Sequence, residues 1–136
     1  MSRVLGIDFG AARVGIAISD SSRTLASGYG FIQFKSYNDL VEDLLQISEK
    51  ESVGEFVIGL PLNMNGSRGF MANKADKLAD LLKTRSKYPV NLIDERLTTV
   101  EAARQIHASG RKVQKGRIDE VAATIILQAF LDGKKS

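Results

Sequence analysis

Residues 3–19 read RVLGIDFGAARVGIAIS, which is two apolar runs separated by a short turn. The first run ends at Asp8, and the second spans Val14–Ser19. Apolar runs bounded by turn residues are typical of buried strands, and a connection this short favours antiparallel pairing. A third strand is predicted at Tyr29–Phe34, so we expect the chain to open with a three-stranded meander.

Two amphipathic helices are predicted in the middle of the chain, with a short strand, Phe56–Ile58, between them. Ser36 or Asn38 is placed to cap the first helix. Its apolar face has helical spacing and consists of Leu40, Val41, Leu44, Leu45 and Ser48. One face of the second helix consists of Ala75, Leu78, Ala79 and Leu82.

The last third of the chain continues this alternation of strands and helices. A fifth strand is predicted at Val90–Ile93, and Thr98 and Glu101 then have the spacing of a capping box. The helix that they begin should end at Gly110, and a final helix is predicted over Ile118–Leu131. A meander followed by alternating elements indicates an α/β fold with a five-stranded mixed sheet flanked by helices.

The composition sets limits on the class of protein. A length of 136 residues suits a single domain over residues 1–136, and 43% hydrophobic with 26% charged residues is typical of a globular chain. The absence of cysteine excludes disulfide frameworks and thiolate zinc sites, and it fits a reducing cytoplasm. No apolar run reaches the length of about 18 residues needed to span a membrane. A net charge of +3 permits a polyanionic partner without requiring one.

Acidic residues recur where strands end or a helix begins. Asp8 ends the first strand, Asp94 and Glu95 follow the fifth, and Asp119 begins the last helix. Each acid has an ordinary structural explanation, either in turn capping or in stabilising a helix dipole. Together, acids at one sheet edge would repel one another unless a cation neutralised them. Strand alternation does not decide between Asp94 and Glu95, because the strand ends there.

The side-chain chemistry of this set favours a hard divalent cation. Carboxylate oxygens select Mg²⁺ or Mn²⁺, whereas the lack of cysteine and the single His107 argue against zinc. Carboxylates that hold two such ions can activate a water molecule for phosphodiester hydrolysis without a side-chain nucleophile.

Four motifs in order resemble those of the YqgF family, which is also called the pre-16S rRNA nuclease or Holliday junction resolvase-like family. The resemblance covers nearly the whole chain. Its motifs are Asp8-Phe9-Gly10 with Arg13, Val14 and Gly15; Gly59-Leu60-Pro61 before Gly66; Asp94-Glu95-Arg96-Leu97-Thr98-Thr99; and Asp119-Glu120-Val121-Ala122-Ala123 with Leu127-Gln128.

This resemblance implies a ribonuclease H-like fold and a metal-dependent nuclease that processes the 5′ end of pre-16S rRNA, with branched DNA as the older proposal for the substrate. Matched motif by motif, it implies that Asp8, Glu95 and Asp119 are both catalytic residues and metal ligands. In related resolvases the second acid ends the fourth strand, where this chain has Gly59. The fifth strand would therefore supply that acid here.

Basic residues are candidates for substrate binding. Arg13 should lie beside Asp8, where it would either contact a phosphate or form a structural ion pair. A second group lies just before the last helix, where it would either steer a phosphate backbone or form a solvated loop; it consists of Arg111, Lys112, Lys115 and Arg117.

Two other classes of function compete with the nuclease. The turn after Asp8 also resembles the phosphate loop of the actin and sugar-kinase superfamily, but those proteins clamp a nucleotide between two domains and this chain has the length of one. The second is a noncatalytic RNA-binding factor in ribosome assembly, which would retain the same fold. An assay for metal-dependent cleavage would distinguish it from the enzyme.

Overall fold

The computed structural model describes residues 2–10, 12–100, 102–104 and 115–133. Its sheet has five strands in the order β3-β2-β1-β4-β5. Strand β1 pairs antiparallel with β2 and parallel with β4, so the predicted meander and the predicted mixed sheet are both confirmed. The elements in chain order are β1 Arg3–Phe9, β2 Arg13–Ser19, β3 Ala26–Gln33, α1 Tyr37–Glu51, β4 Val53–Leu60, α2 Phe70–Ser86, β5 Val90–Asp94, the 3₁₀ turn η1 Glu95–Leu97, and α4 Lys115–Gly133.

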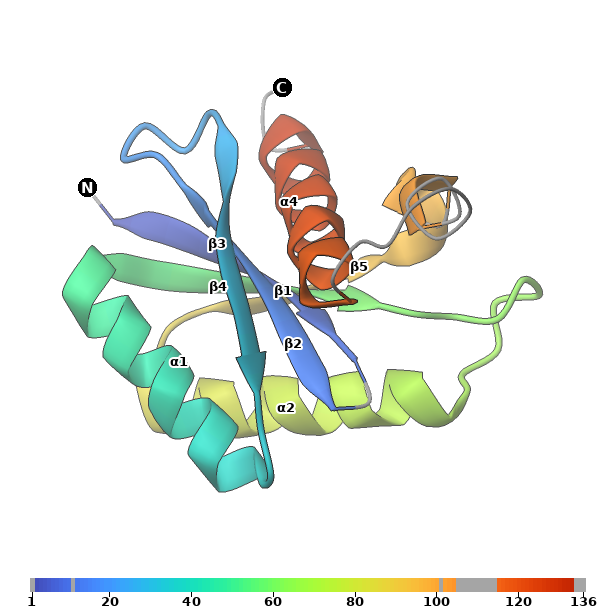
Figure 1. Cartoon of the computed structure of the whole chain (residues 1–136), viewed down its shortest axis with the longest axis horizontal. Coiled ribbons are helices and arrows are strands. Elements are labelled where there is room, and N and C mark those ends of the chain that lie inside the picture. The colour runs from blue at the N-terminus through green and yellow to red at the C-terminus, as the bar shows by residue number, and fades with distance from the viewer. Residues whose placement is uncertain (1, 11, 101, 105–114, 134–136) are drawn as a thin grey trace.

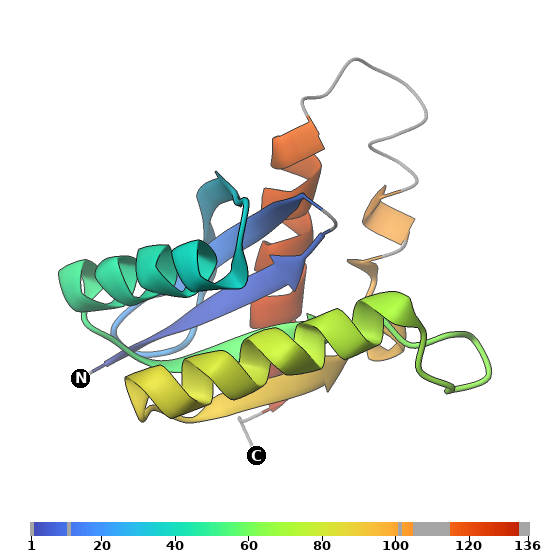
Figure 2. The same ribbon diagram turned by 90° about the horizontal axis from the view of Figure 1, so that it is seen from below.

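Helices cover both faces of this sheet. Helices α1 and α2 lie on one face and α4 crosses the other (Figures 1 and 2). Alternation along β1 divides the core accordingly, because Leu5 and Ile7 pack in the cluster with α1 and α2 whereas Val4 packs with α4. Asp8 is an even number of residues from Val4 and therefore belongs to the α4 face.

The amphipathic patterns predicted for α1 and α2 are confirmed. Ser36 is the N-cap of α1, and its hydroxyl accepts a hydrogen bond from the backbone N–H of Asp39 at 3.1 Å. The apolar positions predicted for α2 are all buried, namely Ala75, Leu78, Ala79 and Leu82. Neither these two helices nor any other described helix is long and apolar enough to cross a membrane.

Glycines let α4 lie directly on the sheet. A Cβ atom added at Gly15 of β2 would fall 1.9 Å from the carbonyl oxygen of Asp119, and one added at Gly6 of β1 would fall 2.6 Å from Cβ of Leu127. At Gly28 of β3 the nearest atom would be the Glu120 carboxylate at 2.8 Å. Because no side chain separates backbone from backbone, α4 brings Asp119 close to β1 and β2.

The boundaries of some elements differ from the predicted ones. Helix α4 begins at Lys115, so the prediction that Asp119 opens this helix is wrong, and Asp119 lies in its second turn. The acid was interpreted as a helix-start signal, but its carboxylate accepts a hydrogen bond from a neighbouring strand instead. Strand β3 begins at Ala26, earlier than predicted. The predicted helix end at Gly110 lies outside the described residues.

Candidate active site

The three predicted acids come from three different elements. Asp8 is the penultimate residue of β1, where it pairs in register with Gly15, and it is 2% exposed. Glu95 begins η1 directly after β5 and is 5% exposed. Asp119 extends from α4 and is partly buried. Buried carboxylates need compensating partners, so their surroundings define what the site can do.

All three acids line one pocket of about 260 Å³. It opens where β1 ends, which is the end of the sheet at which ligand sites gather in α/β proteins. The other lining residues are Phe9, Gly10, Pro61, Met71 and Arg104. The structure thus brings together the side chains that the sequence singled out.

The Glu95 side chain lies above Gly59, near the end of β4, where the strand has no side chain. A Cβ atom added at Gly59 would fall 2.5 Å from Cδ1 of Ile126 and 2.8 Å from Oε1 of Glu95, so these two side chains share the space above that glycine. In register, Gly59 lies opposite Ile93 of β5, two residues before Glu95. The absence of a side chain at Gly59 therefore leaves room for Ile126 of α4 and for the acid that follows β5.

Asp94 has a different set of contacts. Its carboxylate caps η1 by accepting the backbone N–H of Arg96 at 2.9 Å, and it also accepts two guanidinium nitrogens of Arg96, the shorter contact being 2.7 Å. The hydrogen bonds from Arg96 hold the pKa of Asp94 below its usual value. Of the two neighbouring acids, only Glu95 lines the pocket.

Arg104 is a residue of the site that the sequence interpretation missed. Its Nη2 lies 2.5 Å from Oδ1 of Asp8 and 3.4 Å from Oε1 of Glu95, so one cationic nitrogen contacts both carboxylates. A signal was present in the sequence, because Arg104 follows the buried Val100 by four residues. In a helix beginning near Thr98, that spacing places both residues on the same face.

Arg13 contacts Asp119 instead of Asp8. Its Nε donates to Oδ2 of Asp119 at 3.2 Å, which corresponds to the structural ion pair considered for this residue. Burial raises the pKa of the Asp119 carboxyl above its usual value, and the negative charge of Asp8 adds to this effect. The hydrogen bond from Arg13 opposes it. At Asp119 the effects of burial and of the Asp8 charge therefore outweigh those of Arg13 and Arg104.

The donor chemistry of the pocket fits a hard divalent cation. Asp8 and Glu95 already share one positive charge, that of Arg104, so their oxygens converge on a point where a cation is stabilised. Asp119 faces Arg13, and within the described part of the chain no three acidic or histidine side chains are arranged to hold one ion together. Because Arg13 contacts Oδ2 of Asp119, coordination by a third carboxylate would use the other oxygen of Asp119 or a rearrangement of this ion pair.

Replacing Arg104 should separate its role as a counter-ion from metal binding. In Arg104→Gln, Asp8 and Glu95 would face each other without the guanidinium, and we expect metal-free unfolding free energy to fall by about 2 kcal/mol. That figure is below the usual cost for a fully buried pair because Arg104 is 29% exposed. Calorimetric titration should show tighter Mn²⁺ binding than in wild type, since the guanidinium of Arg104 no longer competes for Asp8 and Glu95.

The control is Arg104→Lys, which keeps the charge and should behave like wild type in both measurements. Equal melting temperatures and equal Mn²⁺ affinities for wild type and Arg104→Gln would show that Arg104 does not compensate these acids.

The remaining basic candidates are only partly described. Arg111 and Lys112 lie outside the described residues, as does His107. Lys115 begins α4, and Arg117 is exposed on its first turn, two residues before Asp119.

Comparisons with known proteins find similarity over nearly the whole chain. A family model described as "RuvX: Holliday junction resolvase" matches residues 2–133. A protein of Caldanaerobacter subterraneus subsp. tengcongensis named "Putative pre-16S rRNA nuclease" is 44% identical, over 98% of this chain and 99% of its own length. One of the same name from Endomicrobium trichonymphae is 41% identical, over 97% of this chain and 96% of its own.

Solved structures show the same fold. The RuvC of T. thermophilus in complex with a Holliday junction substrate superposes with a TM-score of 0.62 at 11% identity, covering 98% of this chain and 96% of that one. The yeast mitochondrial Holliday junction resolvase superposes with a TM-score of 0.53 at 15% identity, covering 98% of this chain and 82% of that one. At these identities the likeness concerns the fold, and the predicted ribonuclease H-like architecture is confirmed.

Proposed function

Because this chain belongs to the RuvX family of nucleases, we propose that it hydrolyses phosphodiester bonds of structured nucleic acid with the help of a divalent metal ion. The observation that carries the proposal is the convergence of Asp8, Glu95 and Asp119 on one pocket at the end of β1. The pocket is lined by several carboxylates, and two of them, Asp8 and Glu95, are almost fully buried. Such an arrangement is unfavourable unless cations neutralise the negative charges.

In this proposal the same three acids hold Mg²⁺ or Mn²⁺. When bound, the metal supplies an activated water and stabilises charge on the leaving oxygen. The chain itself supplies the rigid positions, since Asp8 is fixed by the sheet and Glu95 by its place over Gly59. Arg104 lies next to both acids and would meet the phosphate with a positive charge.

Substrate binding is proposed for the basic residues around this pocket. Arg13 adjoins Asp119 and would contact a phosphate once that ion pair opens. Neutralisation of several phosphates would come from the basic residues before and at the start of α4, which are Arg111, Lys112, Lys115 and Arg117.

For the substrate we propose pre-16S rRNA, trimmed at its 5′ end in the cytoplasm, where bacterial ribosomes are assembled. The name shared by the relatives of about 40% identity supports this choice. Holliday junction cleavage is the second candidate, supported by the description of the family. A noncatalytic role in ribosome assembly is the third.

One gel experiment ranks these candidates. End-labelled precursor rRNA and a synthetic four-way DNA junction are each incubated with the protein in Mg²⁺, in Mn²⁺ and in chelator. We expect the RNA to be cut near the mature 5′ end with either metal and to stay intact in chelator. Cleavage of the junction alone would make the resolvase the function. Binding without cleavage of either substrate would make the protein a noncatalytic factor.

A further inference from the structure

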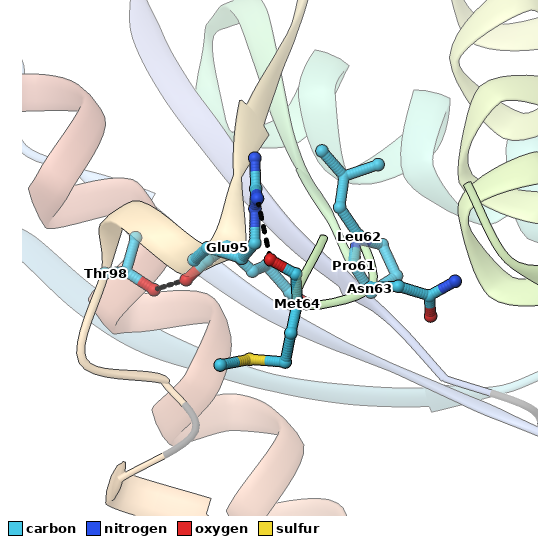
Figure 3. A pocket seen from close by; sticks show the side chains of 7 residues that line it. Pro61, Leu62, Asn63, Met64, Glu95 and Thr98 are labelled. Carbon is cyan, nitrogen blue, oxygen red and sulfur yellow. Dashed lines mark hydrogen bonds between the residues drawn. The ribbon is translucent and has the colours of Figure 1, made fainter. Parts of the chain in front are cut away.

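A second pocket adjoins the acidic one. It has a volume of about 630 Å³ and lies between the loop after β4 and the segment that begins η1 (Figure 3). It shares Glu95 and Pro61 with the acidic pocket, so the two pockets are adjacent. Its other lining residues are Leu62, Asn63, Met64, Arg96 and Thr98. A neighbouring part of a substrate bound at the acids is therefore within reach of this space.

The charges of this second pocket argue against a phosphate there. The guanidinium of Arg96 is held by the Asp94 carboxylate through Nε at 3.1 Å and Nη2 at 2.7 Å, so its charge is already balanced. Its remaining nitrogen, Nη1, donates to the carbonyl oxygen of Met64 at 3.3 Å, as Figure 3 shows. Glu95 adds a negative charge, which would repel phosphate oxygens.

The lining of the pocket instead suits a largely apolar group with hydrogen-bonding edges. Pro61, Leu62 and Met64 provide apolar contact, while the amide of Asn63 and the hydroxyl of Thr98 are polar groups at the same pocket. Met64 is 92% exposed, so its side chain is open to contact with a group that enters the pocket. A flexible thioether adapts to irregular surfaces, and a fixed guanidinium plane stacks on bases.

Resting on the nuclease function proposed above, we propose that this pocket binds an unpaired nucleobase next to the scissile phosphate. A base inside a helix is stacked and paired, so only a single-stranded or extruded nucleotide can enter a pocket. The substrate class is therefore a nucleic acid with an unpaired nucleotide beside the cut, in RNA or DNA. The volume lies within the range of about 300–1,000 Å³ for small-ligand pockets.

The test measures binding in chelator, where no cleavage occurs. Fluorescence anisotropy compares a blunt RNA duplex with the same duplex carrying a single-stranded extension, and the series is repeated in DNA. The first unpaired position carries 2-aminopurine, whose emission changes when it leaves the stack. The variants are Met64→Ala and, as a matched control, Leu25→Ala. Leu25 is another exposed apolar residue (63%) and lies at the opposite end of β2 from the acids.

We expect wild type to prefer the extended duplex and Met64→Ala to lose about fivefold or more of that affinity, the lower range for a lost base contact. Met64→Ala should bind the blunt duplex as wild type does, and Leu25→Ala should bind both duplexes as wild type does. The change in 2-aminopurine emission on binding should be smaller with Met64→Ala than with wild type. Equal losses on blunt and extended duplexes, or no preference for the extension, would overturn the base pocket. The nuclease proposal would still stand if wild type cleaves its substrate with metal, so the two failures are distinguishable.

Discussion

Asp8→Asn, Glu95→Gln and Asp119→Asn are each expected to abolish metal-dependent cleavage while the protein remains folded. Each change keeps the size of the side chain but removes a negative charge that the bound metal would require. Because the acids act on the same ion or ions in the proposed mechanism, any one loss should cost nearly as much as all three together. The measurement is the single-turnover rate on labelled substrate in Mg²⁺ and Mn²⁺, with circular dichroism and a melting curve for each variant.

Asp94→Asn is the matched control for this series. It removes the same charge from the residue next to Glu95, but its carboxylate holds Arg96 outside the acidic pocket. We expect it to retain cleavage at saturating substrate. If Asp94→Asn is inactive and Glu95→Gln is fully active, the assignment within this pair is wrong. If all three acid variants remain active, the metal mechanism fails.

Gly15→Ala should have the largest effect on stability. The new methyl group would fall 1.9 Å from the carbonyl oxygen of Asp119, and backbone atoms of α4 cannot rotate away from it as a side chain can. The helix must shift outward, at a cost of about 3 kcal/mol in unfolding free energy, the upper range for overpacking. For a chain of this size, that lowers the melting temperature by about 10 °C. Since Asp119 moves with α4, cleavage should fall about a hundredfold.

Gly133→Ala provides the comparison. Gly133 is the last residue of α4, and a methyl group added there would meet no described atom within 4 Å. We expect a melting temperature and a cleavage rate near those of wild type. A Gly15→Ala protein as stable as Gly133→Ala would show that α4 does not depend on Gly15 for its position.

Most of the fold could be predicted because its patterns are local. The hairpin at residues 3–19 and the apolar faces of α1 and α2 follow from hydrophobic periodicity and turn residues, and the structure contains them. The start of α4 could not be obtained in this way. Its first residues, Lys115 and Gly116, carry no apolar pattern, and the acid at Asp119 was misread as the helix-start signal.

The candidate site could be predicted only as a list of acids. Which side chain of the Asp94–Glu95 pair turns inward depends on η1 and on the room that Gly59 leaves above β4. Both depend on tertiary packing. Arg104 could not be identified as a partner of Asp8, because the two are 96 residues apart and neither position alone marks a contact. Contacts between residues so far apart in the sequence are determined by how the elements pack. Sequence periodicity indicates only which residues of an element are buried.

The placement of the acids along the chain affects when the protein can become active during its synthesis. Asp8 lies in β1 near the beginning, Glu95 follows β5, and Asp119 lies in α4. A nascent chain that ends before residue 115 lacks the third acid, and it also lacks the apolar residues of α4 that cover one face of the sheet, Ala122, Ala123, Ile126 and Leu127. Domains fold as cooperative units once their non-local contacts are available. Translation would therefore complete the core and the proposed catalytic site together, and an unfinished chain emerging from a ribosome would lack the proposed nuclease activity.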